Sequence, residues 1–465
     1  MNYLTHSDKI VQFFDKNFNE KKCHDLAQKY QFIKRSSSKL KGYEFIKVMI
    51  IPCSGLSLDS LSGLCKRIEN FNPEAKVTAQ ALCLRINNIS SSKLMKGLFV
   101  ELLQQLKQHF HADEKLNSIM NVFNRVLVQD SSCITLNEKL EAIYKGNKRA
   151  NADIKSQLKI DLIYDLVNGS TLDVSLFNGN EPDQALAGRV IKFLEPKDLL
   201  IRDLGYFSIV ALKTITEVGA YFLSRLMPRV HFYLNQTDNE PLDLGVHLRQ
   251  KKYAHLNVIE IEGFVGKEKI AARLIIYRQP PEVTNKRMRE ATRYGRNEKM
   301  SKSKRICMQF SMFITNVPSE LLSANIIGTI YRLRWEIELV FKRWKDQLEI
   351  DHLKGIKRER IDCLIWSRLC TVLLIELACG YFRSLAEKTF QREFSEVKFI
   401  QYLLREDCFC RAVLSNELEK FFKQIALDTP RMLLKDKRYR KTMRERVFTN
   451  ETYYESYVID NQMIA

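Results

Sequence analysis

The sequence lacks the cysteine patterns and the leader segment that mark zinc-binding or secreted proteins. Its eleven cysteines form no CxxC pair, and the closest two, Cys408 and Cys410, are separated by a single residue, which is poor spacing for zinc. An odd cysteine count without a paired framework is typical of reduced thiols. The N-terminal stretch has no apolar signal segment. We therefore expect a cytoplasmic protein.

A long uncharged hydrophobic run is also missing. The most apolar stretch, residues 364–379, contains Arg368 and Glu376, so it predicts a buried helix and not a membrane span. The eight histidines are dispersed, and no internal repeat or low-complexity tract is present. Nucleophilic catalysis by Ser, Cys or His is therefore not indicated.

The chain is strongly basic. It has 465 residues, which predicts two to four domains, and its hydrophobic content of 45% and charged content of 28% are globular values. The formal net charge of +19 attracts a polyanion, and nucleic acid is the first candidate. A ribosomal or membrane-surface protein could be as basic, so charge alone does not decide the function.

The middle of the chain alternates between strand and helix patterns. Two strands joined at Asn168-Gly169 give a strong hairpin signal. The predicted elements are strands at 125–130, 159–165 and 171–177, a helix at 181–193, a strand at 199–203, a helix at 208–218 and a strand at 221–226. This order is that of the α/β ribonuclease H-like fold, in which the first and fourth strands lie side by side.

That strand order brings two carboxylates together. Asp130 and Asp203 each end a predicted strand, and the fold would make them neighbours although they are 73 positions apart. Taken singly, an aspartate at a strand end is more often a cap or a turn residue. A pair at adjacent strand ends favours a catalytic or metal-binding role.

A third carboxylate lies on a predicted helix. At about 100° per residue, Tyr331, Arg334, Glu338 and Lys345 share one face of a continuous helix over residues 331–345. An apolar stripe beside them predicts a core-facing side. Its residues are Ile330, Leu333, Ile337, Val340, Phe341, Trp344 and Leu348. For an isolated helix, an ordinary amphipathic surface with ion pairs would be the simpler interpretation.

The spacing Tyr-x2-Arg-x3-Glu-x6-Lys resembles the signature of the YREK family of bacterial insertion-sequence DDE transposases. The resemblance covers residues 120–385. It implies that Glu338 is the third catalytic carboxylate and that Tyr331, Arg334 and Lys345 contact the DNA end. The segments that begin at Asp130 and at Asp203 resemble the first two motifs of that family.

The resemblance also implies a β-rich insertion, which we place at residues 228–305. Its end, residues 286–305, is rich in Lys and Arg and is expected to be a loop lying on phosphate, although a solvated run is the alternative. The candidate DNA contacts there are Arg293, Arg296, Lys302, Lys304 and Arg305. The family usually has a base-stacking tryptophan in or after the insertion. None occurs between residues 204 and 334, so Phe310 or Met312 would serve instead.

The expected domains follow from these boundaries. Residues 1–118 form a helical DNA-binding domain, residues 119–227 and 306–385 form the catalytic domain around the insertion, and residues 386–465 form a helical region for DNA contact or dimerisation. A turn and short helix near residues 77–85 suit a helix-turn-helix, and a helical domain that only packs is about as probable a reading. Further basic groups lie at Lys34, Arg35, Lys39, Lys41 and residues 431–446.

Three converging carboxylates repel one another unless cations lie between them. Oxygen ligands favour two Mg²⁺ ions, with Mn²⁺ as a possible substitute. By resemblance, the chain is a homodimeric transposase that acts on double-stranded DNA at the nucleoid, with no membrane role. The resemblance implies that it cleaves the terminal inverted repeats of its element and joins their 3′-hydroxyls to target DNA. The alternatives are a ribonuclease H-like nuclease or resolvase, and a non-catalytic DNA-binding descendant of a transposase.

Overall fold

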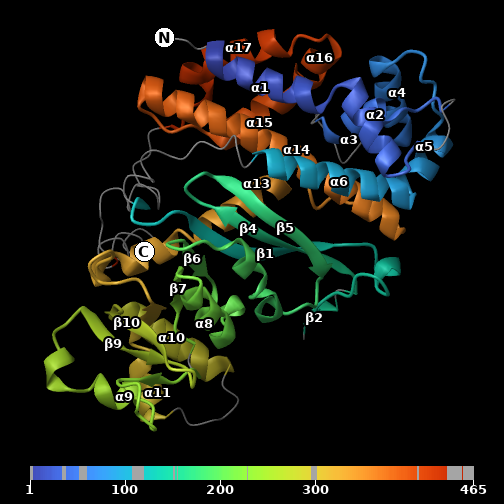
Figure 1. The fold of residues 1–465 in the computed structure, drawn as a ribbon. Helices are drawn as coiled ribbons and strands as arrows, with labels where there is room; N and C mark the ends of the chain where they lie inside the picture. Colours follow the sequence, from blue (N-terminus) through green and yellow to red (C-terminus); the bar gives the residue numbers. More distant parts are fainter. Residues whose placement is uncertain are drawn as a thin grey trace.

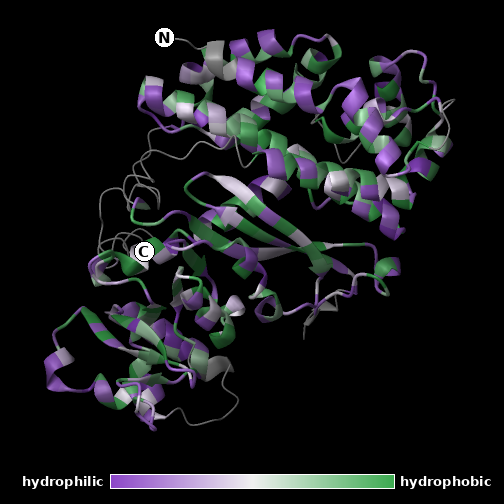
Figure 2. Cartoon of the chain, viewed as in Figure 1, coloured by the Kyte–Doolittle hydropathy of each residue, from purple (hydrophilic) through white to green (hydrophobic). Residues whose placement is uncertain are grey.

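The protein is built around one sheet, which has a helical layer above it and continues downward into a smaller lobe (Figure 1). The computed structural model describes residues 4–33, 38–51, 60–106, 120–149, 152–153, 155–227, 229–294, 301–405, 408–436 and 453. Hydrophobic residues run along the central strands and along the helices that face them (Figure 2). The sheet therefore forms the scaffold on which the other elements pack.

The sheet has nine strands in the order β5-β4-β1-β6-β7-β11-β10-β9-β8. Their bounds are β1 (Val126–Thr135), β4 (Gln157–Asp165), β5 (Ser170–Asn178), β6 (Leu199–Arg202), β7 (Tyr221–Arg225), β8 (Phe232–Tyr233), β9 (Val258–Val265), β10 (Ile270–Arg278) and β11 (Phe310–Thr315). β1 pairs antiparallel with β4 and parallel with β6, and β6 pairs parallel with β7. This half of the sheet is the predicted ribonuclease H-like arrangement, which is confirmed.

The segment at 181–193 differs from the prediction. In place of one α-helix it forms two 3₁₀ turns, η2 (Asp183–Leu186) and η3 (Arg189–Phe193), with Gly188 between them. Glycine is a weak helix former, and the i→i+3 bonds of this segment do not continue into an α-helix. The next predicted helix is present as α8 (Ile209–Glu217), which is capped by the Ser208 hydroxyl.

The predicted β-rich insertion extends the same sheet. β10 pairs with β11 over six positions, so the added strands join the catalytic strands edge to edge. Its helices are α9 (Leu244–His247), α10 (Pro281–Tyr294) and α11 (Lys302–Cys307). The prediction that residues 286–305 form a loop is wrong for the described part, because a proline opens α10 and Ser301 caps α11. Residues 295–300 lie outside the described residues.

Helices from the two ends of the chain form one layer over the sheet (Figure 1). The N-terminal helices are α1 (Leu4–Asn17), α2 (Glu20–Lys29), α3 (Gly42–Ile50), α4 (Leu61–Phe71), α5 (Ala79–Ile86) and α6 (Ile89–Leu106). The C-terminal helices are α14 (Arg358–Leu385), α15 (Glu396–Leu404), α16 (Cys408–Leu414) and α17 (Leu418–Asp428). α1 packs against α17, and α6 packs against α14.

The long helix α14 is the one described helix whose length and composition would allow it to cross a membrane, and most of it is buried inside the protein. It packs against α6 above and β5 below. A helix that is apolar on all sides is a core helix when other elements surround it. The predicted buried helix is therefore confirmed.

The short helix expected near residues 77–85 is present as α5, which begins after the cap residue Thr78 and packs against α4. Its role on DNA stays a prediction. Of the basic groups expected to contact phosphate, Lys34 and Arg35 lie outside the described residues, as do residues 437–446.

Candidate active site

Asp130 and Asp203 are brought together by the parallel pairing of β1 with β6. The last pair in this register joins Gln129 to Arg202, and each aspartate is the next residue. Asp130 does not end its strand as predicted, because β1 continues to Thr135 while the shorter β6 stops at Arg202. Asp203 instead begins the 3₁₀ turn η4 (Leu204–Tyr206).

The segment that carries Glu338 forms two helices and not one. α12 (Ala324–Arg332) ends and α13 (Trp335–Asp346) begins on either side of Arg334, so the predicted continuous helix is wrong at this point. The Leu333 N–H donates to the Ile330 carbonyl at 2.9 Å, and the Arg334 N–H to the Tyr331 carbonyl at 3.1 Å. These i→i+3 bonds tighten the chain into a short turn. The predicted apolar stripe is nevertheless buried throughout.

One guanidinium group contacts all three carboxylates. Arg334 Nη1 lies 2.8 Å from Glu338 Oε1 and 3.4 Å from Asp130 Oδ2. Arg334 Nε lies 3.9 Å from Asp203 Oδ1. Arg334 is only 9% exposed, and Asp130 is the least exposed of the three acids, so solvent screens their ion pair least. The three acids predicted from the sequence therefore meet around a single cation.

Tyr331 and Lys345 lie on either side of this cluster. The Tyr331 hydroxyl donates to Asp203 Oδ1 at 3.4 Å. The Lys345 ammonium donates to the carbonyl of Cys133 in β1 at 3.2 Å, three residues beyond Asp130. Lys345 thus joins α13 to β1, and Tyr331 joins α12 to the residue that follows β6.

Burial perturbs the titration of this cluster. The pKa of Asp130 is raised to about 6, mainly by burial, although the Ser131 N–H and Arg334 oppose the shift. Burial and the nearby Asp203 raise the pKa of Tyr331 to about 12. Burial lowers the pKa of Arg334, but Asp203, Tyr331 and the other two acids outweigh it, so that pKa is raised. Arg334 is therefore charged, and its charge helps Asp130 to ionise.

Comparison with known proteins identifies the family of this chain. Residues 122–374 match the family described as the transposase DDE domain. The chain belongs to this family. The transposase is similar to that of insertion sequence element IS231F from Bacillus thuringiensis subsp. israelensis, with 28% identity over 394 residues and 81% of each chain covered. It is also similar to the IS1151 transposase of Clostridium perfringens, with 25% identity over 448 residues, 90% of this chain and 92% of the relative.

A solved piggyBac transposase synaptic complex with hairpin DNA is also similar, at a TM-score of 0.43 and 10% identity, covering 94% of this chain and 84% of that one. The family match and the curated relatives identify the chain as a bacterial insertion-sequence DDE transposase. It is an enzyme of DNA transposition that cleaves and joins DNA strands with divalent metal.

The donor set suits a hard divalent cation, but the carboxylates are not arranged around an ion as they stand. Among the described residues, no group of three or more His, Cys, Asp or Glu side chains is placed to hold a metal. Arg334 contacts all three acids and neutralises them in place of a metal ion. The acids offer only oxygen ligands, which Mg²⁺ and Mn²⁺ prefer. The residues therefore fit such ions once Arg334 withdraws.

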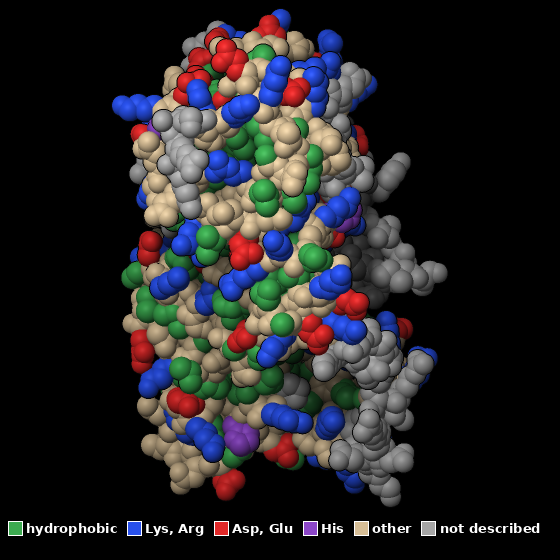
Figure 3. Space-filling view, turned by 90° about the vertical axis from the view of Figure 1, so that its right-hand side faces the viewer, with side chains coloured by type: hydrophobic (Ala, Val, Ile, Leu, Met, Phe, Trp, Pro, Cys, Tyr) green, Lys and Arg blue, Asp and Glu red, His purple; other side chains and the backbone are tan. Residues whose placement is uncertain are grey.

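The candidate basic contacts lie away from the acids. Lys302, Lys304 and Arg305 are exposed on α11, which Figure 1 places at the far end of the lower lobe. The side chain of Arg293 and the whole of Arg296 lie outside the described part of the chain. Figure 3 shows Lys and Arg spread over one face of the molecule from the helical layer to the lower lobe.

The two residues expected to stack on a base are poorly placed to do so. Phe310 is 5% exposed, and the Arg278 guanidinium lies 4.9 Å from the centre of its ring. Met312 packs against the same core. Trp335 is a better candidate, since it is 54% exposed and its ring centre lies 5.5 Å from the Arg334 guanidinium. The sequence does not single it out, because it follows Arg334 directly and lies beyond the insertion and its returning strand.

Proposed function

We propose that Asp130, Asp203 and Glu338 are the catalytic carboxylates of the transposase and that they bind two Mg²⁺ ions, for which Mn²⁺ can substitute. The observation that carries this proposal is the contact of all three with the single guanidinium of Arg334. Acids that share one buried cation can share a divalent ion instead. When bound, two such ions activate the attacking water or 3′-hydroxyl and stabilise the leaving oxygen.

Arg334 moves from the acids to the DNA in this proposal. A guanidinium binds phosphate bidentately, so the backbone of the DNA end can take over the contacts that Arg334 makes to carboxylates without DNA. Lys345 would leave the Cys133 carbonyl for a second phosphate. Tyr331, which already reaches Asp203, would orient the strand beside that acid. Binding of the end and loading of the metal are thereby coupled.

The transposase would act on double-stranded DNA in the bacterial cytoplasm, at the nucleoid. It would bind the terminal inverted repeats of its own insertion sequence, pair two ends as a homodimer, nick them and join the 3′-hydroxyls to target DNA. Residues 1–118 and 386–465 would provide end binding and dimerisation around the catalytic residues 119–227 and 306–385. The insertion, residues 228–305, would supply further phosphate contacts through α11.

The direct test uses isosteric variants on end DNA. Asp130→Asn, Asp203→Asn and Glu338→Gln each remove one charge and keep the side-chain volume. Each should lose nearly all Mg²⁺-dependent nicking while gel-shift binding to the same oligonucleotide survives, because binding depends on basic residues elsewhere.

Glu336→Gln is the matched control, since Glu336 lies on the same helix with Arg343 as its charged neighbour. It should nick like wild type. Wild-type nicking by all three acid variants would refute the assignment. Wild-type protein that binds ends but never nicks with Mg²⁺ or Mn²⁺ would favour a non-catalytic DNA-binding role.

A further inference from the structure

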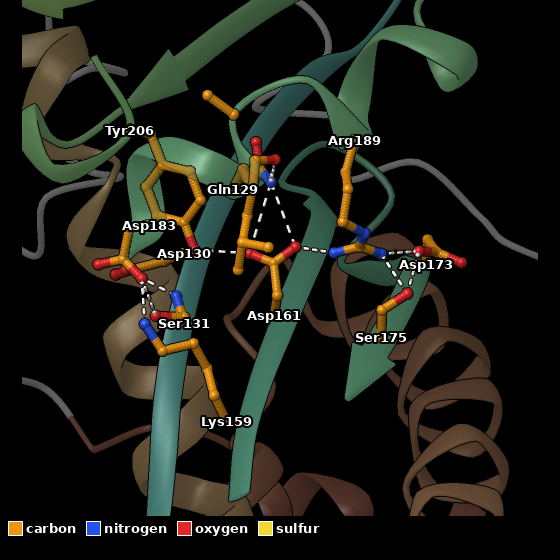
Figure 4. Close-up of polar contacts among 12 residues, drawn as sticks. Gln129, Asp130, Ser131, Lys159, Asp161, Asp173, Ser175, Asp183, Arg189 and Tyr206 are labelled. Carbon is orange, nitrogen blue, oxygen red and sulfur yellow. Dashed lines mark hydrogen bonds and ion pairs between the residues drawn. The ribbon is translucent and has the colours of Figure 1, made fainter. Parts of the chain in front are cut away.

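A second polar cluster surrounds Asp161 and includes both chain neighbours of Asp130 (Figure 4). Consecutive residues of a strand point to opposite faces, so Gln129 and Ser131 point away from the face that carries Asp130. Asp161 of β4 is paired with Ser131 in register and is fully buried. This polar layer is covered by the 3₁₀ turns η2, η3 and η4.

Asp161 is the centre of the layer. Its carboxylate accepts a hydrogen bond from the Tyr206 hydroxyl at 2.5 Å and one from the Gln129 amide at 3.2 Å. It also forms an ion pair with Arg189, which in turn pairs with Asp173 of β5. These contacts link β1, β4 and β5 to the η3 and η4 turns.

Both neighbours of Asp130 in the chain are anchored in this layer. The Gln129 amide donates to the Leu186 carbonyl at 3.1 Å in addition to Asp161. The Ser131 hydroxyl donates to Asp183 at 2.8 Å. The backbone that carries Asp130 is therefore held from the far side of the sheet at the residue before it and at the residue after it.

The chain around Asp203 is held in the same way. The residue before it, Arg202, donates to the Ala187 carbonyl at 2.7 Å. Three residues after it, Tyr206 donates its N–H to the Asp203 carbonyl at 3.1 Å and its hydroxyl to Asp161. Through these hydrogen bonds, Asp161 and residues 183–189 hold the backbone that carries Asp130 and Asp203.

Stability does not explain this arrangement well. A buried ion pair gains little over well-packed apolar residues, because the cost of removing both charges from water offsets their attraction. The hydrogen bonds and ion pairs of this layer nevertheless tie the strands to the turns, and a catalytic site needs its groups held to about 0.5 Å.

We propose that Asp161 and Tyr206 are positioning residues for metal binding by Asp130 and Asp203. They set the separation of the two strand backbones from behind, without touching DNA or metal. This inference rests on the proposed function of the three acids. It predicts that removing one hydrogen bond on the Asp161 side of the sheet weakens metal binding by the acids on the opposite side.

Tyr206→Phe is the sharpest test, because it removes the hydroxyl alone. Nicking of end DNA should slow about 10-fold, the lower end of the range for loss of a group that orients a metal ligand. The Mn²⁺ concentration for half-maximal nicking should rise several-fold, and Mn²⁺ affinity of the protein–end-DNA complex, measured by electron paramagnetic resonance, should fall in parallel. Affinity for end DNA should stay within about twofold of wild type, since the basic residues that neutralise phosphates are unchanged.

Tyr144→Phe is the matched control. Tyr144 is also buried, and its hydroxyl donates to a carboxylate, that of Asp362 on α14, which carries none of the three acids. It should lose similar thermal stability and keep wild-type metal dependence. Asp161→Asn, which keeps the side-chain volume but removes the charge that faces Arg189, should shift the metal dependence in the same direction as Tyr206→Phe.

Unchanged rate and metal dependence in Tyr206→Phe would overturn the proposal, as would equal changes in Tyr144→Phe. Failure of the proposed function itself is separate: it would appear as absent nicking by wild type or as full nicking by Asp130→Asn, whatever Tyr206→Phe does.

Discussion

Arg334 and Glu338 lie one helical turn apart at the start of α13 and form an ion pair, with 2.8 Å between Nη1 and Oε1. The same nitrogen lies 3.4 Å from Asp130 Oδ2. A divalent ion bound by these carboxylate oxygens would compete with the Arg334 guanidinium for them. Arg334 is therefore placed to neutralise the acids when neither metal nor DNA is bound.

Arg334→Ala should destabilise the metal-free protein by about 2 kcal/mol, because it leaves a buried carboxylate without its charged partner. Mg²⁺ or Mn²⁺ should then raise the melting temperature of the variant more than that of wild type, as measured by thermal unfolding with and without metal. Lys342→Ala, at an exposed cation on the same helix, is the control. Equal metal-induced shifts in both variants and wild type would contradict this role of Arg334.

Lys345→Ala should slow nicking of end DNA about 10-fold and leave thermal unfolding nearly unchanged. The expected loss corresponds to one charge-assisted hydrogen bond to phosphate, about 1.5 kcal/mol. Single-turnover nicking beside Lys342→Ala checks it. If Lys345→Ala nicks at the wild-type rate, its bond to the Cys133 carbonyl is a structural contact only.

The environment of Glu376 predicts a pH dependence of folding stability that does not involve the active site. This glutamate of α14 is half-buried and accepts hydrogen bonds from the Thr171 N–H and hydroxyl, both at 3.0 Å. Burial raises its pKa from 4.5 to about 7, although Thr171 opposes the shift and the nearby Arg343 opposes it further.

Between pH 4.5 and about 7 the folded state therefore binds more protons at Glu376 than the unfolded state, and stability falls as the pH rises. Glu376→Gln should remove this fall, so that the variant gains on wild type from pH 4.5 to 7 and the difference is constant above that. Urea unfolding across the range measures it. Parallel stability curves for the two proteins would show that Glu376 keeps an ordinary pKa.

The strand order and the acid pair were predictable because they follow from local patterns. Hairpin chemistry at Asn168-Gly169 and alternating strands and helices define the ribonuclease H-like half of the sheet, and parallel pairing then brings Asp130 beside Asp203. The break at Arg334 was not predictable, since 100° periodicity continues through a single 3₁₀ turn. The prediction that Glu338 faces the two aspartates was right, although the helix is not continuous.

The sequence pattern of β4 did not reveal the polar layer on the Asp161 side of the sheet. In β4, charged Lys159 and Asp161 alternate with Leu158, Ile160 and Leu162, which is typical of a strand with one solvated face. The structure buries every residue of β4, because the turns at 183–206 cover the polar face. Such irregular turns have no periodic signal, so their side-chain contacts become visible only in three dimensions.

Trp335 carries the last prediction. Its exposed ring beside Arg334 can stack on a base displaced from the DNA end, since aromatic–base stacking contributes about 1–3 kcal/mol. Trp335→Ala should slow cleavage at the end about 10-fold or more, and Trp335→Phe should recover much of that rate because it restores an aromatic face. Thermal unfolding should change little, because the side chain is mostly in solvent. Leu339→Ala, at a similarly exposed apolar residue of α13, is the control.

Fluorescence of 2-aminopurine placed at the end of the DNA measures base displacement directly, and it should rise on binding to wild type and much less on binding to Trp335→Ala. An equal rise with both proteins would leave Trp335 without a role in stacking.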